Sequence, residues 1–272
     1  MNRIYPIRLS AYHALFKLTW QRNLEERANV FLERIRNVAL FFSLYFMWSA
    51  VLGNRGSILG YEKAQLLTYV IGMSLLRALV LSAQSDQVAQ EIASGRVAAI
   101  LLRPIHHLLY WLTRDLAEKA LHGSAVIVEL AVFILLLRPS LFFPHQWSSL
   151  LFSISGILLA GFLYFLMTYL VGLAGFWTSE SGGPRFCFAL LLEFCAGAFF
   201  PLDVLPAFLR GFLLWTPFPY MVFFPLNIYL GRLDSAQILQ GMCIGWAWVA
   251  VIGMTVHYVW QAGLRSYAAE GG

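Results

Sequence analysis

The chain has little charge, and this scarcity excludes most classes of soluble protein. Of its 272 residues, only 12% are Asp, Glu, Lys or Arg and 60% are hydrophobic. The mean hydropathy is +0.69. A soluble domain carries about 25% charged residues, so this chain has too little polar surface to cover a water-soluble globule. Soluble enzymes, disordered chains and nucleic-acid-binding modules are therefore excluded.

Two long stretches lack charged residues altogether. No Asp, Glu, Lys or Arg occurs from Pro139 to Ser179 or from Ser235 to Leu264. The hydrocarbon core of a bilayer needs roughly 20 apolar residues in a helix, and each stretch is longer than that. The sequence predicts an all-α polytopic membrane protein with six transmembrane helices. We place these at Val38–Leu52, Ala64–Ala83, Leu116–Leu137, Ser149–Trp177, Phe186–Phe200 and Gln237–Ala262.

Motifs for catalysis, cofactors and metals are also missing. The three cysteines form no CxxC or Cys/His spacing, and no HExxH occurs. None of the three lysines stands in the Gly-Lys-Ser/Thr order that a phosphate-binding loop requires. We therefore expect no catalytic, cofactor-binding or metal-binding residue in this chain.

The distribution of Lys and Arg predicts the orientation. With the six spans above, 13 of the 19 lie on the side of the N-terminus and five on the other side. Positive loops stay in the cytoplasm, so both termini are predicted to be cytoplasmic. The net charge of +5 then reflects topology and indicates no nucleic-acid partner. We expect residues 1–272 to form a single membrane domain, with a cytoplasmic amphipathic segment (1–37), a six-span bundle (38–262) and a cytoplasmic tail (263–272).

Two regions outside the predicted spans have distinctive patterns. Residues Ser10–Arg36 place apolar and charged side chains on different sides of a helix, as in helices that lie in the membrane interface. Residues Pro201–Asp234 are apolar but contain five prolines, which forbid one continuous helix. We predict a re-entrant hairpin between spans five and six, made of two half-helices at Asp203–Trp215 and Tyr220–Gly231, because burial among the spans would satisfy their backbone.

The loop after the second predicted span carries a family resemblance. Glu91, Gly95, Leu101, Leu102 and Pro104 reproduce a pattern of Glu, Gly, Leu-Leu and Pro, and further matches are spread along the chain. These include Gly175-Phe-Trp177, Phe200-Pro-Leu-Asp203 and Pro217-Phe-Pro-Tyr220. Over essentially its whole length the chain resembles the bacterial ABC-2-type permease subunits of ATP-binding-cassette exporters.

This resemblance implies a non-catalytic transmembrane subunit in the lipid of a bacterial plasma membrane. It would pair with a second permease, identical or related, and separate ATPase subunits would bind ATP and Mg. Residues Asp86–Ala98, between spans two and three, would form a cytoplasmic coupling helix. Glu91 would contact the ATPase or cap its own helix, and Gly95 would end the helix or permit close approach. The implied coupling residues are Asp86, Gln87, Gln90, Glu91, Gly95 and Arg96.

Three charged residues fall inside predicted spans. Arg77, Glu129 and Glu193 would each cost about 2.5–3.5 kcal/mol in a bilayer, and such residues usually face the bundle interior. They could line an export path or bind a proton, or they could join helices, for example Arg77 with one of the glutamates.

The aromatic residues of the outer hairpin also allow two interpretations, substrate binding or packing. Phe218, Tyr220 and Phe224, near Asp203 in the same hairpin, could grip an amphipathic substrate, but burial of a re-entrant element would also require aromatic residues.

Two other functional classes stay open at this point. A stand-alone secondary transporter could use Glu129 or Glu193 as its proton site, and it would need no ATPase partner. A non-transporting membrane scaffold would show no substrate-stimulated ATP hydrolysis. Co-purification with an ATP-hydrolysing subunit separates the first of these from an exporter.

Overall fold

The computed structural model is almost entirely helical, as the sequence predicts. It describes residues 9–25, 27–53, 56–58, 60–82, 85–144, 146–178 and 182–270. Within these ranges the only strands are the short antiparallel pair β1 (Ser57–Ile58) and β2 (Tyr61–Glu62), in which Ile58 pairs with Tyr61.

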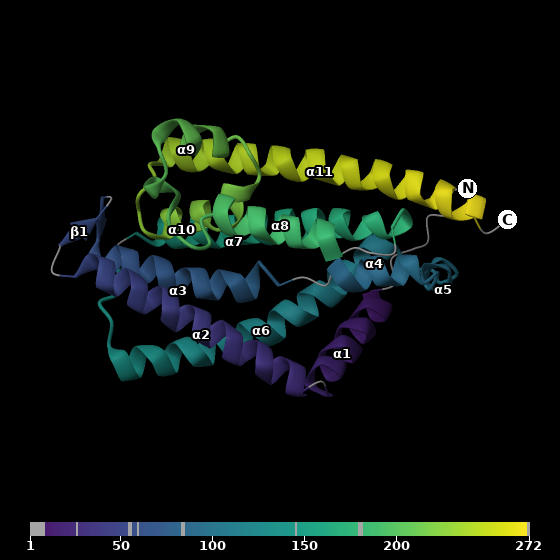
Figure 1. Cartoon of the computed structure of the whole chain (residues 1–272), viewed down its shortest axis with the longest axis horizontal. Coiled ribbons are helices and arrows are strands. Elements are labelled where there is room, and N and C mark those ends of the chain that lie inside the picture. Colours follow the sequence, from purple (N-terminus) through teal and green to yellow (C-terminus); the bar gives the residue numbers. More distant parts are fainter. Residues whose placement is uncertain are drawn as a thin grey trace.

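Helices α3 (Lys63–Leu79), α7 (Trp147–Gly172), α8 (Gly182–Cys195) and α11 (Ser235–Glu270) run along the long axis of the molecule (Figure 1). Helices α2 (Arg27–Leu52) and α6 (His107–Leu137) cross this axis obliquely. Helix α7 packs against α11 on one side, and α3 packs against α2 and α6 on the other. Fully buried leucines such as Leu66 on α3 and Leu163 on α7 belong to the hydrophobic core, and Leu159 packs against Gly245 of α11.

Four helices are long and apolar enough to cross a membrane. In the described residues these segments are Val30–Leu52, His107–Leu137, Trp147–Phe176 and Ser235–Tyr267, and they correspond to predicted spans one, three, four and six. Helix α3, at the second predicted span, has 17 residues, and α8, at the fifth, has 14. At 1.5 Å per residue these are about 26 and 21 Å long, short of a core of about 30 Å. The count of six spans therefore remains a prediction.

The amphipathic segment and the first span meet at a different point from the one predicted. Helix α1 (Leu9–Glu25) packs on α6, and residues Arg27–Arg36, predicted as part of the amphipathic helix, belong to α2. No Gly or Pro interrupts the sequence from Arg27 to Leu52, so nothing ends this helix near Val38. At the other terminus α11 reaches Glu270, so most of the predicted tail is helical.

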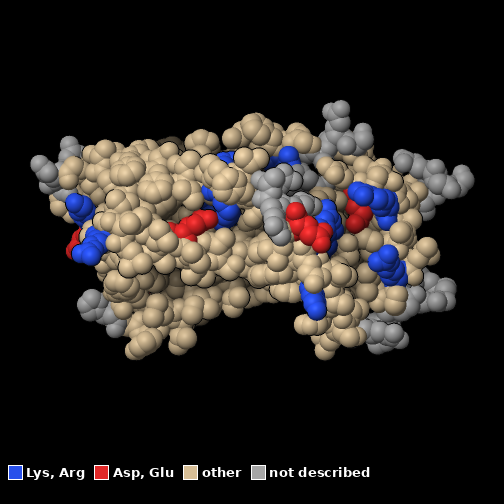
Figure 2. Space-filling view, turned by 90° about the horizontal axis from the view of Figure 1, so that it is seen from below, with Lys and Arg blue, Asp and Glu red and all other residues tan. Residues whose placement is uncertain are grey.

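Different helices and strands lie at the two ends of the molecule. Helices α4 (Ser85–Ala93) and α5 (Val97–Leu101) lie at one end with the C-terminal part of α11, and β1, α9 (Ala207–Leu213) and α10 (Phe223–Tyr229) lie at the other (Figure 1). Figure 2 shows that charged side chains gather towards the ends of one face, with only a small group in its middle. This distribution suits a protein whose middle lies in lipid.

The proline-rich segment turns back into the bundle. Helix α8 ends at Cys195, five residues before the predicted end of span five, and Gly197 follows with φ +82°. The chain then forms η2 (Leu202–Val204), α9, η3 (Phe218–Met221) and α10, so both predicted half-helices are shorter than expected. Helix α10 is buried against α7 and α3. Its re-entrant position in a membrane remains a prediction.

Candidate functional site

Helix α4 presents two different faces. Val88, Ala89 and Ile92 are buried, whereas Gln90 is exposed. Gly95 follows with φ +74°, a left-handed conformation that glycine adopts without strain. This turn ends α4 and starts the separate helix α5, so the predicted single coupling helix from Asp86 to Ala98 is divided in two.

The buried face of α4 lies directly against the backbone of η1 (Leu173–Phe176). A Cβ atom added to Gly175 would lie 2.5 Å from the carbonyl oxygen of Ala89 and 2.9 Å from its Cα. Neither atom can move without moving the helix, so only glycine permits this approach. The 3-10 turn that continues α7 therefore packs directly against the buried face of α4.

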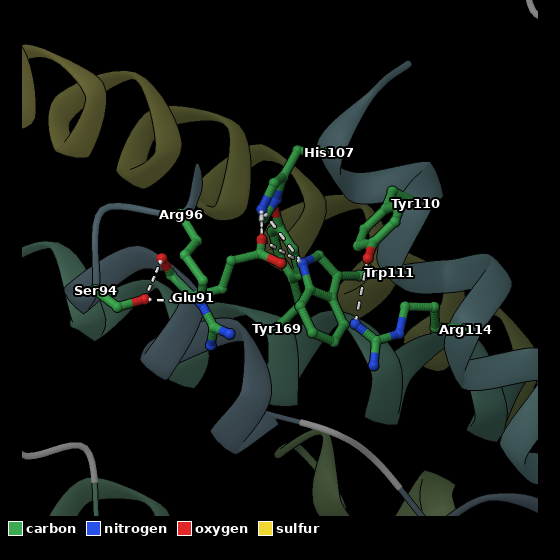
Figure 3. A network of polar contacts seen from close by, with 8 residues as sticks. All are labelled: Glu91, Ser94, Arg96, His107, Tyr110, Trp111, Arg114 and Tyr169. Carbon is green, nitrogen blue, oxygen red and sulfur yellow. Dashed lines mark hydrogen bonds and ion pairs between the residues drawn. The ribbon is translucent and has the colours of Figure 1, made fainter. Parts of the chain in front are cut away.

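One carboxylate on α4 is surrounded by aromatic side chains. Glu91 is 8% exposed, and its Oε1 lies 2.9 Å from Nε2 of His107 and 3.3 Å from Nε1 of Trp111, both on α6. The other ring nitrogen of His107, Nδ1, lies 2.7 Å from the hydroxyl of Tyr169 on α7. Figure 3 shows these four side chains converging. We call Glu91, His107, Trp111 and Tyr169 the Glu91 cluster.

One arrangement of protons gives each of these donors an acceptor. The hydroxyl of Tyr169 donates to Nδ1 of His107, whose Nε2–H donates to Glu91, and the indole N–H of Trp111 also donates to Glu91. Each donor then has an acceptor, and the carboxylate accepts two hydrogen bonds away from water. Hydrogen bonds to a charged group contribute about 1.5–3 kcal/mol each, so α4 is firmly attached to α6.

Further contacts extend the Glu91 cluster to α11 and along α6. The rings of His107 and Trp260 stack with centroids 4.5 Å apart. The hydroxyl of Tyr267 donates to the carbonyl of Gly95 over 3.2 Å. Arg114 is buried beneath α4, where its guanidinium donates to Gln87 and lies 4.4 Å from the centre of the Trp111 ring. Helix α4 therefore contacts α6 and α7, and the turn that follows it contacts α11.

The predicted coupling residues occupy different positions on this end. Helix α4 includes Asp86, whose side chain lies outside the described part of the structure. Gln87 faces Arg114, while Gln90 and Arg96 are exposed and Arg96 donates to the hydroxyl of Ser94. The expected role of Glu91, contact with the ATPase or a cap on its own helix, stays a prediction. In the structure its side chain points into the bundle, where the carboxylate accepts from His107 and Trp111.

The intramembrane charges form two separate ion pairs. Arg77 on α3 donates two hydrogen bonds to Glu193 on α8, one of 2.6 Å, as the helix-joining interpretation predicts. Glu129 does not join them, and its closest described cation is Arg34 on α2, at 3.9 Å. These contacts connect α3 with α8 and α6 with α2.

A second carboxylate organises the opposite end. Asp203 accepts hydrogen bonds from the hydroxyl of Tyr61 (2.6 Å) and from Arg210 (2.8 Å), and Arg232 lies 3.6 Å away. Burial raises the pKa of Tyr61, and the hydrogen bond to Asp203 raises it further, so the hydroxyl remains a donor. Asn227 lies 3.2 Å from the same hydroxyl. We call these five residues the Asp203 cluster.

The hairpin aromatics are mostly used in packing. Phe224 is buried where α10 meets Gly241 of α11, because a Cβ there would lie 2.2 Å from its ring. Tyr220 is also buried, which raises its pKa to about 12, and its hydroxyl donates to the carbonyl of Leu214. Phe218 is partly buried against the same core. These contacts favour burial over the gripping of a substrate.

A family model for ABC-2 family transporter proteins matches residues 38–271, most of the chain. The chain belongs to the ABC-2 family of transporter proteins. No match is found among curated proteins. The family and the four apolar helices establish a multi-pass membrane protein with a permease role. ABC-2 permeases are generally non-catalytic, and the family implies association with an ATP-binding-cassette ATPase.

Sequence reasoning missed most of the Glu91 cluster in this ABC-2 protein. His107, Trp111 and Tyr169 were not among the candidate residues, although His107 and Trp111 are four residues apart and so share one face of a helix. The sequence did contain a signal for this cluster: a histidine and a tryptophan at this spacing, at the polar start of an apolar helix. Tyr169 had no comparable signal, because its partner is 62 residues away.

Proposed function

We propose that this chain is the membrane-spanning subunit of an ATP-driven exporter, with α4 as the coupling helix on which a separate ATPase acts. One observation carries the proposal: Glu91 joins α4 to α6 and, through His107, to α7. A displacement of α4 would therefore move the long helices as a rigid body. The partner would bind ATP and Mg, since the sequence contains no phosphate-binding loop.

The two faces of α4 have different parts in the proposed coupling. Glu91 faces inward and fastens the helix to the bundle, so it acts as a positioning residue. Gln90 and Arg96 are exposed on the same end and would contact the ATPase. Gly95 permits the sharp turn between α4 and α5, which lets both helices lie on this end.

The proposed assembly is a pair of permeases in a bacterial plasma membrane, with both termini of each chain in the cytoplasm. The arrangement of the termini supports this orientation. Tyr12 on α1 accepts a hydrogen bond from the backbone of His106, and Tyr267 near the end of α11 donates to Gly95. Both terminal helices thus reach the end that carries α4, where an ATPase would dock.

The ion pairs weigh against a proton-driven carrier. Glu193 is held by Arg77, and Glu129 lies beside Arg34. Each carboxylate therefore has a cation on another helix, which is the arrangement expected of a tie between helices. A non-transporting scaffold would have no need of a helix with one face fastened to the bundle and the other exposed.

The experiment replaces the charge of Glu91 without changing its shape. We expect Glu91→Gln to fold and to co-purify with the ATPase, because the exposed face of α4 is unchanged. The amide is a weaker acceptor than the carboxylate, so α4 would be held less firmly. ATP hydrolysis by the complex in proteoliposomes should then fall about tenfold, which corresponds to about 1.4 kcal/mol.

Two further variants make the result specific. Glu25→Gln removes the same charge from an exposed position on α1 and should leave ATP hydrolysis unchanged. Gln90→Ala should weaken binding of the ATPase with little effect on the thermal stability of the permease. If no ATP-hydrolysing subunit co-purifies, or if Glu91→Gln turns over at the wild-type rate, the proposal is wrong.

A further inference from the structure

A cavity of about 570 Å³ opens between α2, α3, α7 and α8. Its lining residues come from the N-terminal half of α2, the C-terminal ends of α3 and α7, and α8. These are the helix ends nearest α4. The charged lining consists of Arg34, Arg36, Arg77, Arg185, Glu33 and Glu193. Each of the two glutamates lies beside one of these arginines, Glu193 beside Arg77 and Glu33 beside Arg36.

Arg34 has unused hydrogen-bonding capacity in this cavity. Its side chain is 12% exposed, and its Nε and Nη1 atoms are buried without a hydrogen-bond partner among the described residues. The carboxylate of Glu129 lies 3.9 Å from Nη1, too far for a hydrogen bond. A buried donor without an acceptor destabilises the folded state, and more so when it is charged. Both atoms lie below the surface of the cavity, so an anion bound there would satisfy them once the guanidinium turns towards it.

The other cations of the cavity differ in their availability. Arg77 is neutralised by Glu193, and the two side chains form part of the wall. Arg36 lies 3.8 Å from Glu33, and its side chain is 75% exposed, so water screens this pair. Of these three arginines, Arg34 is the buried one whose ion pair, with Glu129 at 3.9 Å, leaves hydrogen-bond donors unused.

The uncharged walls of the same cavity are largely apolar. Leu40, Leu81, Phe186 and Leu192 line it beside the charged residues. A second hollow of about 540 Å³, lined almost wholly by apolar residues of α2 and α6, lies on the other side of α2. A small inorganic anion would leave these apolar walls in contact with water, whereas an alkyl chain would cover them.

We propose that the cavity binds an amphiphilic anion, a molecule with a phosphate or carboxylate head and an alkyl chain, whose head lies against Arg34. Binding itself requires only this chain. The further statement that such anions are the cargo rests on the proposed function, and it would place their uptake at the end of the molecule that carries α4.

Direct binding to the purified protein tests the site. The probe is radiolabelled dodecyl phosphate, added to the full chain in nanodiscs of phosphatidylcholine. We expect saturable binding that Arg34→Gln weakens about tenfold, because the variant loses the charge but keeps most of the side-chain volume. Ala189→Trp should abolish binding by filling the cavity, since Ala189 lines it from α8 and is exposed. Arg265→Gln, which removes an exposed charge from α11, should have no effect.

Two competitors identify the part of the ligand that is recognised. Dodecanol has the chain without the charge, and inorganic phosphate has the charge without the chain. We expect neither to displace the probe at equimolar concentration. Displacement by dodecanol would overturn recognition of charge, and displacement by phosphate would overturn the role of the chain. Equal binding to wild type, Arg34→Gln and Ala189→Trp would show that the probe binds elsewhere and would overturn the site.

A separate measurement tests the cargo. In the complex with the ATPase, dodecyl phosphate should stimulate ATP hydrolysis in wild type but not in Ala189→Trp. Binding without stimulation would overturn the assignment of amphiphilic anions as cargo. Because binding is measured on the permease alone, failure of the coupling proposal for α4 would leave the binding result unaffected.

Discussion

Two clusters around carboxylates lie at opposite ends of the molecule, and they are built from different partners. Glu91 accepts hydrogen bonds from imidazole and indole groups on a long helix. Asp203 instead lies among two arginines and a tyrosine. Its partner Arg210 has a side chain that is 43% exposed, whereas the side chain of His107 is 3% exposed. One cluster is therefore dry and the other is partly wet.

This difference indicates how each end responds to force. Water can replace a broken contact in the Asp203 cluster, so its geometry can change gradually. The side chains of the Glu91 cluster are buried from solvent, so its contacts are either made or lost together. Packed interiors with two discrete arrangements transmit small displacements efficiently. The Glu91 cluster is thus suited to transmission, and the Asp203 cluster to holding β2, α9 and α10 together.

The most disruptive change predicted at the α4 end is Gly175→Ala. Its methyl group would collide with the backbone of Ala89, so α4 must leave its place. We expect a loss of about 3 kcal/mol in stability, measured by thermal unfolding in detergent, together with loss of ATPase co-purification. Gly161→Ala in α7 is the control, because nothing lies within 4 Å of its added methyl group. Unchanged co-purification in Gly175→Ala would contradict the packing of α4 on η1.

A smaller effect should distinguish the two carboxylates. Glu91→Ala leaves the donors of His107 and Trp111 buried without an acceptor, which costs about 2 kcal/mol. In Asp203→Ala the arginines reach water and the hydroxyl of Tyr61 keeps Asn227 as an acceptor, so the loss should be about 1 kcal/mol. Chemical denaturation of both variants in the same detergent compares the two values. An equal or larger loss for Asp203→Ala would reverse the assignment of dry and wet clusters.

The fold was predictable from the sequence where long apolar runs decided it. The charge-free stretches predicted both ends of α7 and the start of α11 to within a few residues, although α11 continues past the predicted Ala262 to Glu270. The five prolines predicted the broken segment before α11. Apolar content could not predict the lengths of α3 and α8, because those helices end where tertiary contacts allow. The turn at Gly197, for example, fits under the hydroxyl of Tyr69, which donates to its carbonyl.

The candidate site was predictable in its location but not in its chemistry. The pattern from Glu91 to Pro104 located α4 through a family resemblance, yet it also suggested an outward role for Glu91. The inward orientation follows from His107 and Tyr169, which come from other helices. The pairing of Arg77 with Glu193 was foreseen as one possibility because an intramembrane charge needs a partner. The choice between Glu129 and Glu193 required the helix arrangement.

The comparison with the smallest expected effect on stability removes one hydroxyl group from each cluster. Tyr61→Phe deletes the donor to Asp203, and Tyr169→Phe deletes the donor to His107. Each variant loses one hydrogen bond of a tyrosine and should cost about 1 kcal/mol in stability. The two substitutions are chemically identical, so any difference in function reflects their positions.

We expect ATP hydrolysis by the reconstituted complex to separate these variants. In Tyr169→Phe, Nδ1 of His107 loses its donor, so the ring can rotate or change tautomer and no longer holds Glu91 in one position. Turnover should fall severalfold, although the ATPase still co-purifies. In Tyr61→Phe the contacts of α4 are untouched, and turnover should match wild type. If both variants, equally destabilised, lose turnover to the same extent, stability alone explains the effect and the Glu91 cluster has no special part in coupling.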